Sequence, residues 1–181
     1  MIRGFQRSRF GKREGKLQNK TLKYLIAFMV ILSGCISVSI KNKDASTKSD
    51  KFKYTSPPSP FEKISSEQAD LAWQNSHSGN TIALLSECSD SKDPSLQTLE
   101  GETIQALTGY QVTKTNNLKF EDRDAMRSEV EGVVDGISVK MNVLTFKKNS
   151  CAYTLTYLGR AKGFSKDISV FENFLQKFHA E

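Results

Sequence analysis

Alternating apolar and polar residues predict several β-strands in the second half of the chain. In residues 137–146 alternate positions are apolar as far as Val143, and residues 153–157 repeat the pattern as Tyr-x-Leu-x-Tyr. This period of two is typical of strands that bury one face. Asp135-Gly136 precedes the first of these strands and predicts a two-residue hairpin turn after residues 126–134. We therefore expect a hairpin-connected antiparallel meander.

Further segments also have the composition of strands. Residues 81–88 (TIALLSEC) form a compact apolar run and are expected to make a hairpin with the segment that contains Trp73. Residues 110–114 and 118–120 are expected to form a short pair around Asn116-Asn117. The expected fold is an antiparallel sheet of about five or six strands.

Two segments have a helical period instead. The first follows Asp93-Pro94, where Asp93 can cap a helix and proline suits its first position, and it is expected to stop at Gly109. The second covers residues 166–179. Its apolar face consists of Ile168, Phe171, Phe174, Leu175 and Phe178. An antiparallel sheet packed by two such helices predicts an α+β domain.

The N-terminal segment has a different pattern. Residues 1–34 hold eight basic residues and one acid, and no charged side chain occurs from Tyr24 to Ile40. A basic stretch followed by a short apolar run is the layout of a secretory signal peptide. An uncleaved transmembrane helix is the alternative. However, seventeen uncharged residues lie at the short limit for a span, and serines dilute their second half.

The apolar run ends in Leu32-Ser33-Gly34-Cys35, which resembles the lipobox of bacterial lipoproteins. The resemblance implies that residues 1–34 are removed as a signal peptide and that Cys35 carries a diacylglycerol and a further acyl chain such as palmitate. Several acyl chains anchor a protein durably in a membrane. Since Ile36 rather than Asp follows the cysteine, the family's sorting habits imply the outer membrane of a Gram-negative cell, with the domain facing the periplasm.

Composition divides the mature chain into two parts. Residues 35–60 are rich in Ser, Lys, Thr and Pro, and we expect a flexible tether because they offer little apolar surface to offset the entropy of ordering. Residues 61–181 are expected to form one globular domain. The net charge is +7 for residues 1–34 but −4 for residues 61–181, so nucleic acid is not expected to bind the domain.

The order of hairpin, helix, antiparallel meander and C-terminal helix resembles the Mog1/PsbP-like fold. The resemblance rests on the strand at 153–157, the Gly163-Phe164 connection and the closing Phe-x-x-Phe-Leu-x-x-Phe at 171–178. Members of this family imply non-catalytic work, such as docking to a partner or helping a membrane complex to assemble. No functional residue of the family can be placed on this chain.

Two cysteines, Cys88 and Cys151, remain once Cys35 is assigned to lipid. Two cysteines in an exported domain are more often paired than free, so we expect a disulfide between two strand ends. In the chain-entropy description, closing a loop of this length stabilises a protein by roughly 4 kcal/mol.

Candidate catalytic and metal-binding residues are few. His77 lies between two serines, but in an expected turn that lacks the Gly-x-Ser-x-Gly context of hydrolases, and His179 lies near the C-terminus. Glu87, Cys88 and Asp90 have no further ligands at the spacing of a zinc site. We therefore expect no catalytic residue, metal or cofactor.

These observations predict a lipid-anchored envelope protein whose domain binds a protein partner or another envelope component without catalysis. A carrier of lipid or of a small apolar ligand is the alternative, and it requires an apolar cavity between the sheet and the C-terminal helix. An envelope hydrolase is a second alternative, and it requires His77 beside a serine and an acid.

Overall fold

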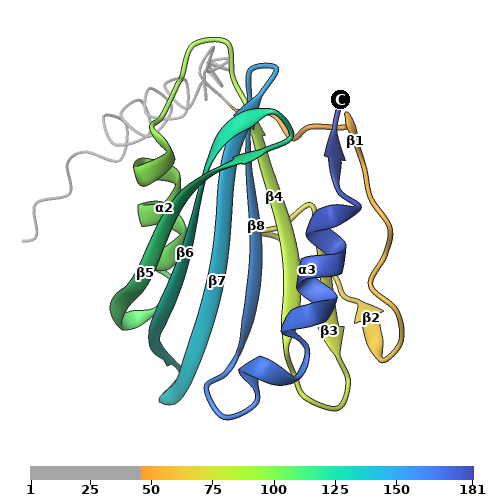
Figure 1. Cartoon of the computed structure of the whole chain (residues 1–181), viewed down its shortest axis with the longest axis vertical. Coiled ribbons are helices and arrows are strands. Elements are labelled where there is room, and N and C mark those ends of the chain that lie inside the picture. The colour runs from red at the N-terminus through yellow and green to blue at the C-terminus, as the bar shows by residue number, and fades with distance from the viewer. Residues whose placement is uncertain (1–45) are drawn as a thin grey trace, which may run out of the picture. The chain divides into compact units, whose positions relative to one another are not determined.

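The main sheet contains seven antiparallel strands in the spatial order β2-β3-β4-β8-β7-β6-β5 (Figure 1). The structure is a computed structural model that describes residues 46–181. The strands of this sheet are β2 (Phe61–Lys63), β3 (Leu71–Asn75), β4 (Thr81–Cys88), β5 (Thr108–Phe120), β6 (Arg123–Val134), β7 (Ile137–Lys148) and β8 (Cys151–Arg160). A second, two-stranded sheet pairs β1 (Phe52–Lys53) with β9 (His179–Ala180).

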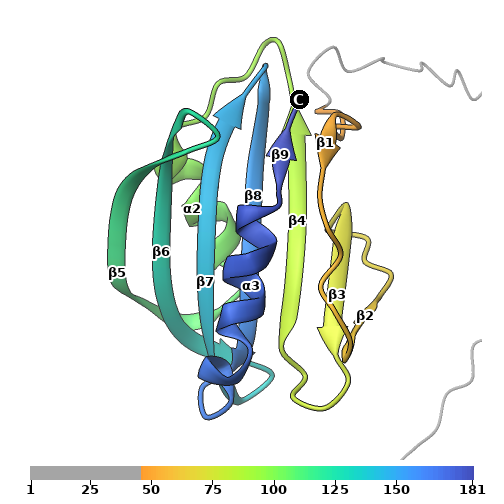
Figure 2. The same cartoon turned by 45° about the vertical axis from the view of Figure 1, so that its right-hand side comes forward.

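Two helices pack on opposite faces of the main sheet (Figure 2). They are α2 (Leu96–Ile104) and α3 (Ile168–Gln176), the latter preceded by the 3-10 helix η1 (Phe164–Lys166). The predicted α+β fold is confirmed. The strands are more numerous than predicted, partly because β1, β2 and β9 are only two or three residues long and too short to show a period. Among residues 46–181, no helix has the length and apolar character needed to cross a membrane.

The larger core lies between the sheet and α3. Tyr153, Leu155 and Tyr157 alternate along β8 toward this side and are at most 1% exposed. Tyr157 stacks on Phe171 of α3, with 5.7 Å between the ring centroids. Such aromatic pairs contribute about 0.5–1.5 kcal/mol beyond the burial of their surface. The aromatic face of α3 therefore holds that helix on the sheet.

A smaller core lies under α2. Its buried members are Ile104, Leu107, Val130, Val139, Met141 and Val143. Gly132 of β6 permits a close approach here, because a Cβ at this position would lie 2.9 Å from the Cβ of Leu107. The helix is thereby placed over β6 and β7, and β4 and β8 lie beside the helix rather than under it.

The ends of α2 differ from those predicted. Ser95, rather than Asp93, caps the helix, because its Oγ accepts a hydrogen bond from the backbone N of Thr98 at 3.1 Å. The helix ends at Ile104, and Gly109 lies inside β5 with a φ of 59°. The further turn of helix that a stop at Gly109 would allow is replaced by the chain reversal into β5.

The first strand after α2 is continuous. A turn at Asn116-Asn117 is therefore a wrong prediction, since these residues lie within β5 and pair with Arg127 and Met126 of β6. The chain reverses instead at Glu121-Asp122, where both residues have positive φ, 53° and 59°. Because β5 is an edge strand exposed along most of its length, it has no apolar alternation that would identify it.

Residues 47–54, which we call the N-terminal strap, are joined to the domain by hydrogen bonds. Thr47 and Cys88 exchange backbone hydrogen bonds at 3.0 and 2.7 Å. The backbone N of Ser49 donates to Ser86 Oγ at 2.8 Å. Along β4, pairing with β3 stops at Leu84. The strap thereby covers the rest of β4, which β3 leaves unpaired.

Aromatic side chains of the strap also reach the larger core. Phe52 stacks on Phe178 with 5.8 Å between ring centroids, and Tyr54 meets Trp73 edge-on at 5.4 Å. The expectation of a flexible tether across residues 35–60 therefore needs correction from residue 47 onward. The segment orders because two aromatic residues supply the apolar contact that its average composition hides.

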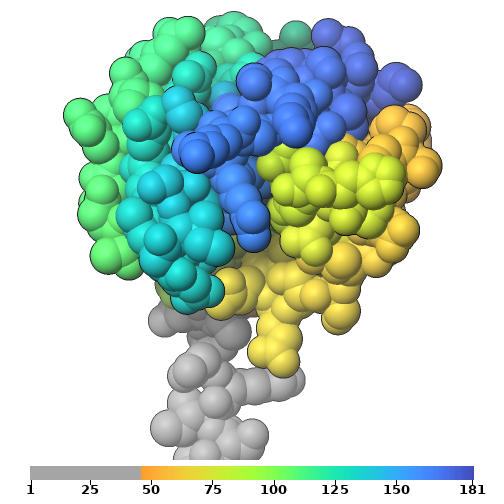
Figure 3. Space-filling view, turned by 90° about the horizontal axis from the view of Figure 1, so that it is seen from below, coloured from red at the N-terminus to blue at the C-terminus, as the bar shows by residue number. Residues whose placement is uncertain are grey.

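A polar network joins the β3–β4 turn to the segment that precedes α3. Asn80 Nδ2 donates to Gly163 O at 3.1 Å and to Asp167 Oδ2 at 2.7 Å, and Ser78 Oγ donates to the same carboxylate oxygen at 2.7 Å. Figure 3 shows the β3–β4 turn against the blue segment that leads into α3. Asn80 also lies against Gly159, where a Cβ would be 2.1 Å from Asn80 Oδ1.

Candidate binding groove

A groove lies beside α2, on the face of the sheet opposite α3. Its base is formed by β4 and β8, one side by α2, and the other by the loop between β2 and β3. Apolar residues of the groove include Ala83, Leu85, Leu99, Ala106 and Ala152. Its volume of about 380 Å³ lies within the range of small-ligand sites. We call this site the α2 groove.

Strand alternation explains which residues form the groove. Ile82 and Leu84 of β4 are fully buried in the larger core, so Ala83 and Leu85, which alternate with them, face α2. The same alternation on β8 places Ala152, Thr154 and Thr156 in the groove. Small side chains on β4 and β8 leave open the space that larger ones would fill.

Negative charge marks one end of the α2 groove. Glu87 and Glu102 are its charged residues within the described part of the chain, and both also line a second, more polar cavity of about 900 Å³. Within residues 46–181, neither glutamate forms an ion pair or a side-chain hydrogen bond. The groove therefore combines an apolar base with uncompensated carboxylates.

Two lysines of the second cavity are held by other partners. Lys147 Nζ donates to Asp93 Oδ1 at 2.6 Å and to Pro94 O at 2.9 Å. Lys148 Nζ lies 3.2 Å from Glu121 Oε2. Both lysines are thus paired with groups other than Glu87 and Glu102.

Phenylalanine side chains occupy the space between the sheet and α3. Phe171, Phe174 and Phe178 are at most 2% exposed and pack into the core of the sheet. The cavity required by the carrier hypothesis was expected on this side, and aromatic side chains fill it. The α2 groove lies on the other face of the sheet.

The cysteine predictions fall in different parts of the chain. Cys35 and the lipobox lie outside the described residues. Cys88 and Cys151 face each other in the β4–β8 register and form a disulfide, with their Cα atoms 3.9 Å apart. This separation is shorter than the usual range of about 4.4–6.8 Å. The sequence places both cysteines at strand ends, but only the register makes them direct neighbours.

The two histidines lie in unrelated places. His77 is exposed in the β3–β4 turn, where its backbone N donates to Asn75 Oδ1 at 2.8 Å. His179 Nδ1 lies 3.0 Å from Glu121 Oε1. Burial opposes ionisation of Glu121, but the hydrogen bonds and charges of His179 and Lys148 outweigh it, and the pKa of Glu121 is lowered. The hydrolase hypothesis requires a histidine beside a serine, and among residues 46–181 neither histidine side chain forms a hydrogen bond to a serine.

The predicted absence of a metal site concerns Glu87, Cys88 and Asp90. The sulfur of Cys88 is committed to the disulfide and cannot act as a thiolate ligand. No group of three or more potential metal ligands occurs among residues 46–181.

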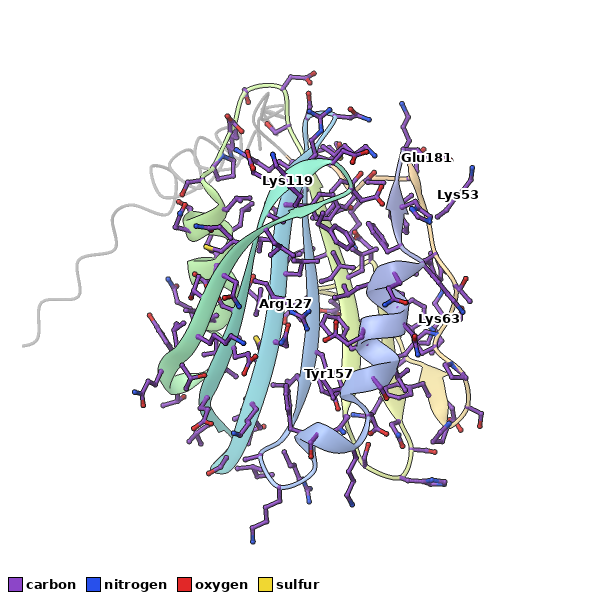
Figure 4. All side chains as sticks on the ribbon, viewed as in Figure 1. Lys53, Lys63, Lys119, Arg127, Tyr157 and Glu181 are labelled. Atoms are coloured by element: carbon purple, nitrogen blue, oxygen red, sulfur yellow. A yellow bond between two sulfur atoms is a disulfide. The ribbon has the colours of Figure 1, made fainter. Side chains whose placement is uncertain are left out.

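One polar constellation was not predicted from the sequence. Arg127 of β6 forms a two-point contact with Glu172 of α3, one bond measuring 3.0 Å, and its Nε donates to Asn142 Oδ1 at 2.8 Å (Figure 4). The guanidinium also lies over the Phe171 ring, 5.9 Å from its centroid. These contacts hold α3 on the sheet, and Arg127 has no separate sequence motif that would identify it.

Tyr157 also serves the packing of α3. Its hydroxyl donates at 2.7 Å to the backbone oxygen of Phe164, in the 3-10 helix η1 that precedes α3. Burial, followed by the negative charge of Asp167, raises the pKa of Tyr157. The tyrosine therefore remains protonated and acts as a hydrogen-bond donor.

The sequence matches no model of a known protein family and no curated protein. Similarity is found among solved structures. LpqN, involved in cell envelope biogenesis of Mycobacterium tuberculosis, has a TM-score of 0.55 and 10% identity, over 75% of this chain and 90% of that chain. Cyanobacterial PsbP (CyanoP) from Synechocystis sp. PCC 6803 has a TM-score of 0.53 and 10% identity, over 83% and 99%. The chain therefore has a PsbP-like fold.

Proposed function

We propose that this chain is a lipid-anchored protein of the bacterial cell envelope whose domain binds a partner in the α2 groove without catalysing a reaction. The observation that carries the proposal is the groove itself, an open apolar site built on two strands and a helix. The lipobox supports the anchor at Cys35. LpqN, which has the same fold, is involved in cell envelope biogenesis, and this role supports an envelope setting for the present chain.

The proposed lack of catalysis is supported by the contacts of the candidate residues. His77 serves a turn, His179 contacts a carboxylate, and Cys88 is bonded to Cys151. A domain that works by binding needs a shaped surface rather than a reactive group, and the α2 groove supplies one. The outer membrane is the proposed location, with the domain facing the periplasm.

Site-specific photocrosslinking in intact cells tests the proposed binding site. A photoreactive amino acid at Ala106, exposed in the groove, should give a defined adduct. The same amino acid at Gln176, exposed on α3, is the control. Ala83→Phe should fill the groove and remove the Ala106 adduct. Identical adducts at both positions, or an adduct unaffected by Ala83→Phe, would contradict the proposal.

The anchor is tested separately. Cells fed an alkyne-bearing palmitate should label the wild-type protein, and Cys35→Ser should abolish the label and leave the precursor uncut. Cys88→Ser is the matched cysteine control and should keep the label. Equal labelling of the Cys35→Ser protein would contradict lipid attachment.

A carrier of a small apolar ligand remains the second candidate function. The volume and apolar base of the α2 groove favour it, although the site lies on the other face of the sheet from the one expected. A lipid that copurifies with the wild-type protein and is lost in Ala83→Phe would favour the carrier over a docking domain.

A further inference from the structure

The charges of the α2 groove restrict what can occupy it. Its charged lining residues, Glu87 and Glu102, are both exposed and have no counter-ion among residues 46–181. The second cavity also contains Lys92 and Arg123, but no ion pair joins either base to these glutamates in the described part of the chain. An occupant that brings a positive charge to this end would be favoured over a neutral or anionic one.

The dimensions of the groove indicate a short occupant. Along β8 its base extends from Ala152 to Thr156, and along β4 from Ala83 to Glu87. Each span covers about 13 Å at roughly 3.3 Å per residue of strand. The groove therefore accommodates about four residues of extended peptide, or an acyl segment of equal length.

Polar groups in the groove distinguish a peptide from an acyl chain. Thr154 and Thr156 are part of its base, and Ser66 and Gln68 line its far side. A peptide backbone can hydrogen-bond to these groups, whereas an acyl chain would remove them from water without replacing their hydrogen bonds. The alkyl surface of Leu85 and its neighbours remains available for apolar side chains.

We propose that the α2 groove recognises a short extended peptide segment with apolar side chains followed by a basic residue. The apolar side chains lie on the β4–β8 base, and the basic side chain lies beside Glu87 and Glu102. The inference rests on the proposed function of the groove as a binding site, and it adds the chemistry of the partner.

Binding of labelled peptides to the full-length chain in nanodiscs tests the inference. The probe is fluorescein-labelled Ala-Leu-Ala-Leu-Lys, with versions ending in glutamine or glutamate, and the readout is the Kd from fluorescence anisotropy. The lysine peptide should bind about fivefold more tightly than the glutamine peptide, as expected for two exposed charge contacts. This difference should disappear in about 0.5 M salt, where such contacts are screened.

Two double variants separate the groove from the overall charge. Glu87→Gln with Glu102→Gln should remove the roughly fivefold preference for the lysine peptide over the glutamine peptide. Glu62→Gln with Glu129→Gln changes the net charge equally at exposed positions outside the groove and should preserve the preference. Thermal unfolding should be alike for both proteins, because all four side chains are exposed.

Several results would overturn the inference. Equal affinities for the three peptides would refute charge recognition, and a loss of preference in the control variant would assign it to nonspecific attraction. Binding of a fluorescent fatty acid in the groove, with no binding of any peptide, would replace the peptide by a lipid. If photocrosslinking at Ala106 still depends on an open groove, these results refute the peptide inference alone and leave the proposed function standing.

Discussion

Replacement of Tyr54 by alanine tests whether the N-terminal strap belongs to the folded domain. If residues 36–60 were a flexible tether, this substitution would not change stability. In the structure the Tyr54 ring meets Trp73 at 5.4 Å and Phe174 at 6.5 Å between centroids. The substitution should therefore lower the free energy of unfolding.

The size of the effect follows from burial and ring contacts. A fully buried large aromatic residue loses about 3–5 kcal/mol on truncation to alanine. Because Tyr54 is only partly buried, we expect about half of that loss, roughly 2 kcal/mol. This figure includes the loss of the two aromatic pairs. For a domain of this size such a loss lowers Tm by roughly 6–10 °C.

Urea unfolding followed by circular dichroism measures this change directly. Thr55→Ala is the matched control, because Thr55 is the exposed neighbour of Tyr54 and should alter the free energy by less than about 0.5 kcal/mol. A loss at Tyr54 no larger than that of the control would refute the ordered strap. It would also restore the sequence-based boundary at residue 61.

Three further predictions concern other parts of the domain. Gly159→Ala should lower the free energy of unfolding by at least about 2 kcal/mol in urea, because the new Cβ would lie 2.1 Å from the buried Oδ1 of Asn80. Gly101→Ala is the control: open space surrounds this position, and the variant should raise the free energy of unfolding by up to about 1 kcal/mol. Glu121→Gln should cost up to about 1 kcal/mol at pH 7. Since the pKa of Glu121 is lowered from 4.5, its contribution is complete above that pH and is lost as pH falls through the folded-state pKa. The unfolding curves of wild type and variant should therefore converge as the pH falls below the folded-state pKa. Reduction of Cys88–Cys151 should destabilise by roughly 2–4 kcal/mol, and intact-mass measurement showing two free thiols in the native protein would contradict the disulfide.

Sequence patterns located the elements that bury one face. The β6–β7 hairpin was predictable because Asp135-Gly136 defines its turn and Val139, Met141 and Val143 alternate with polar residues. The α3 helix was predictable because its apolar residues return every three or four positions. In both cases the apolar residues that form the local pattern are the residues that the fold buries.

Elements without a buried face were not predictable in the same way. β5 is exposed at an edge, and Asn116-Asn117 inside it has the composition of a turn. In the N-terminal strap, Phe52 and Tyr54 are separated by Lys53 and surrounded by Ser and Lys, so the average composition resembles a disordered linker. Their order depends on partners that lie more than a hundred residues away or in the core, which local composition does not encode.

The α2 groove was also outside the reach of the sequence. It exists because Ala83, Ala152 and Thr154 are small and because α2 lies over β6 and β7 rather than over β4 and β8. A strand pattern alone does not show that these small side chains border open space. That becomes clear only when the position of α2 on the sheet is known. Glu87 and Glu102 are similarly ordinary exposed glutamates until the fold brings them to one end of the groove.

The pairing of β1 with β9 brings the two ends of the described domain together. The backbone N of Glu181 donates to Lys51 O at 2.9 Å, and Lys53 forms an ion pair with Glu181 (Figure 4). A short glycine linker could therefore join the last residue to the strap and close the domain into a ring. New ends opened at Asp135-Gly136 would give a circular permutant that retains every strand pairing, with a fusion site remote from the strap and Glu181.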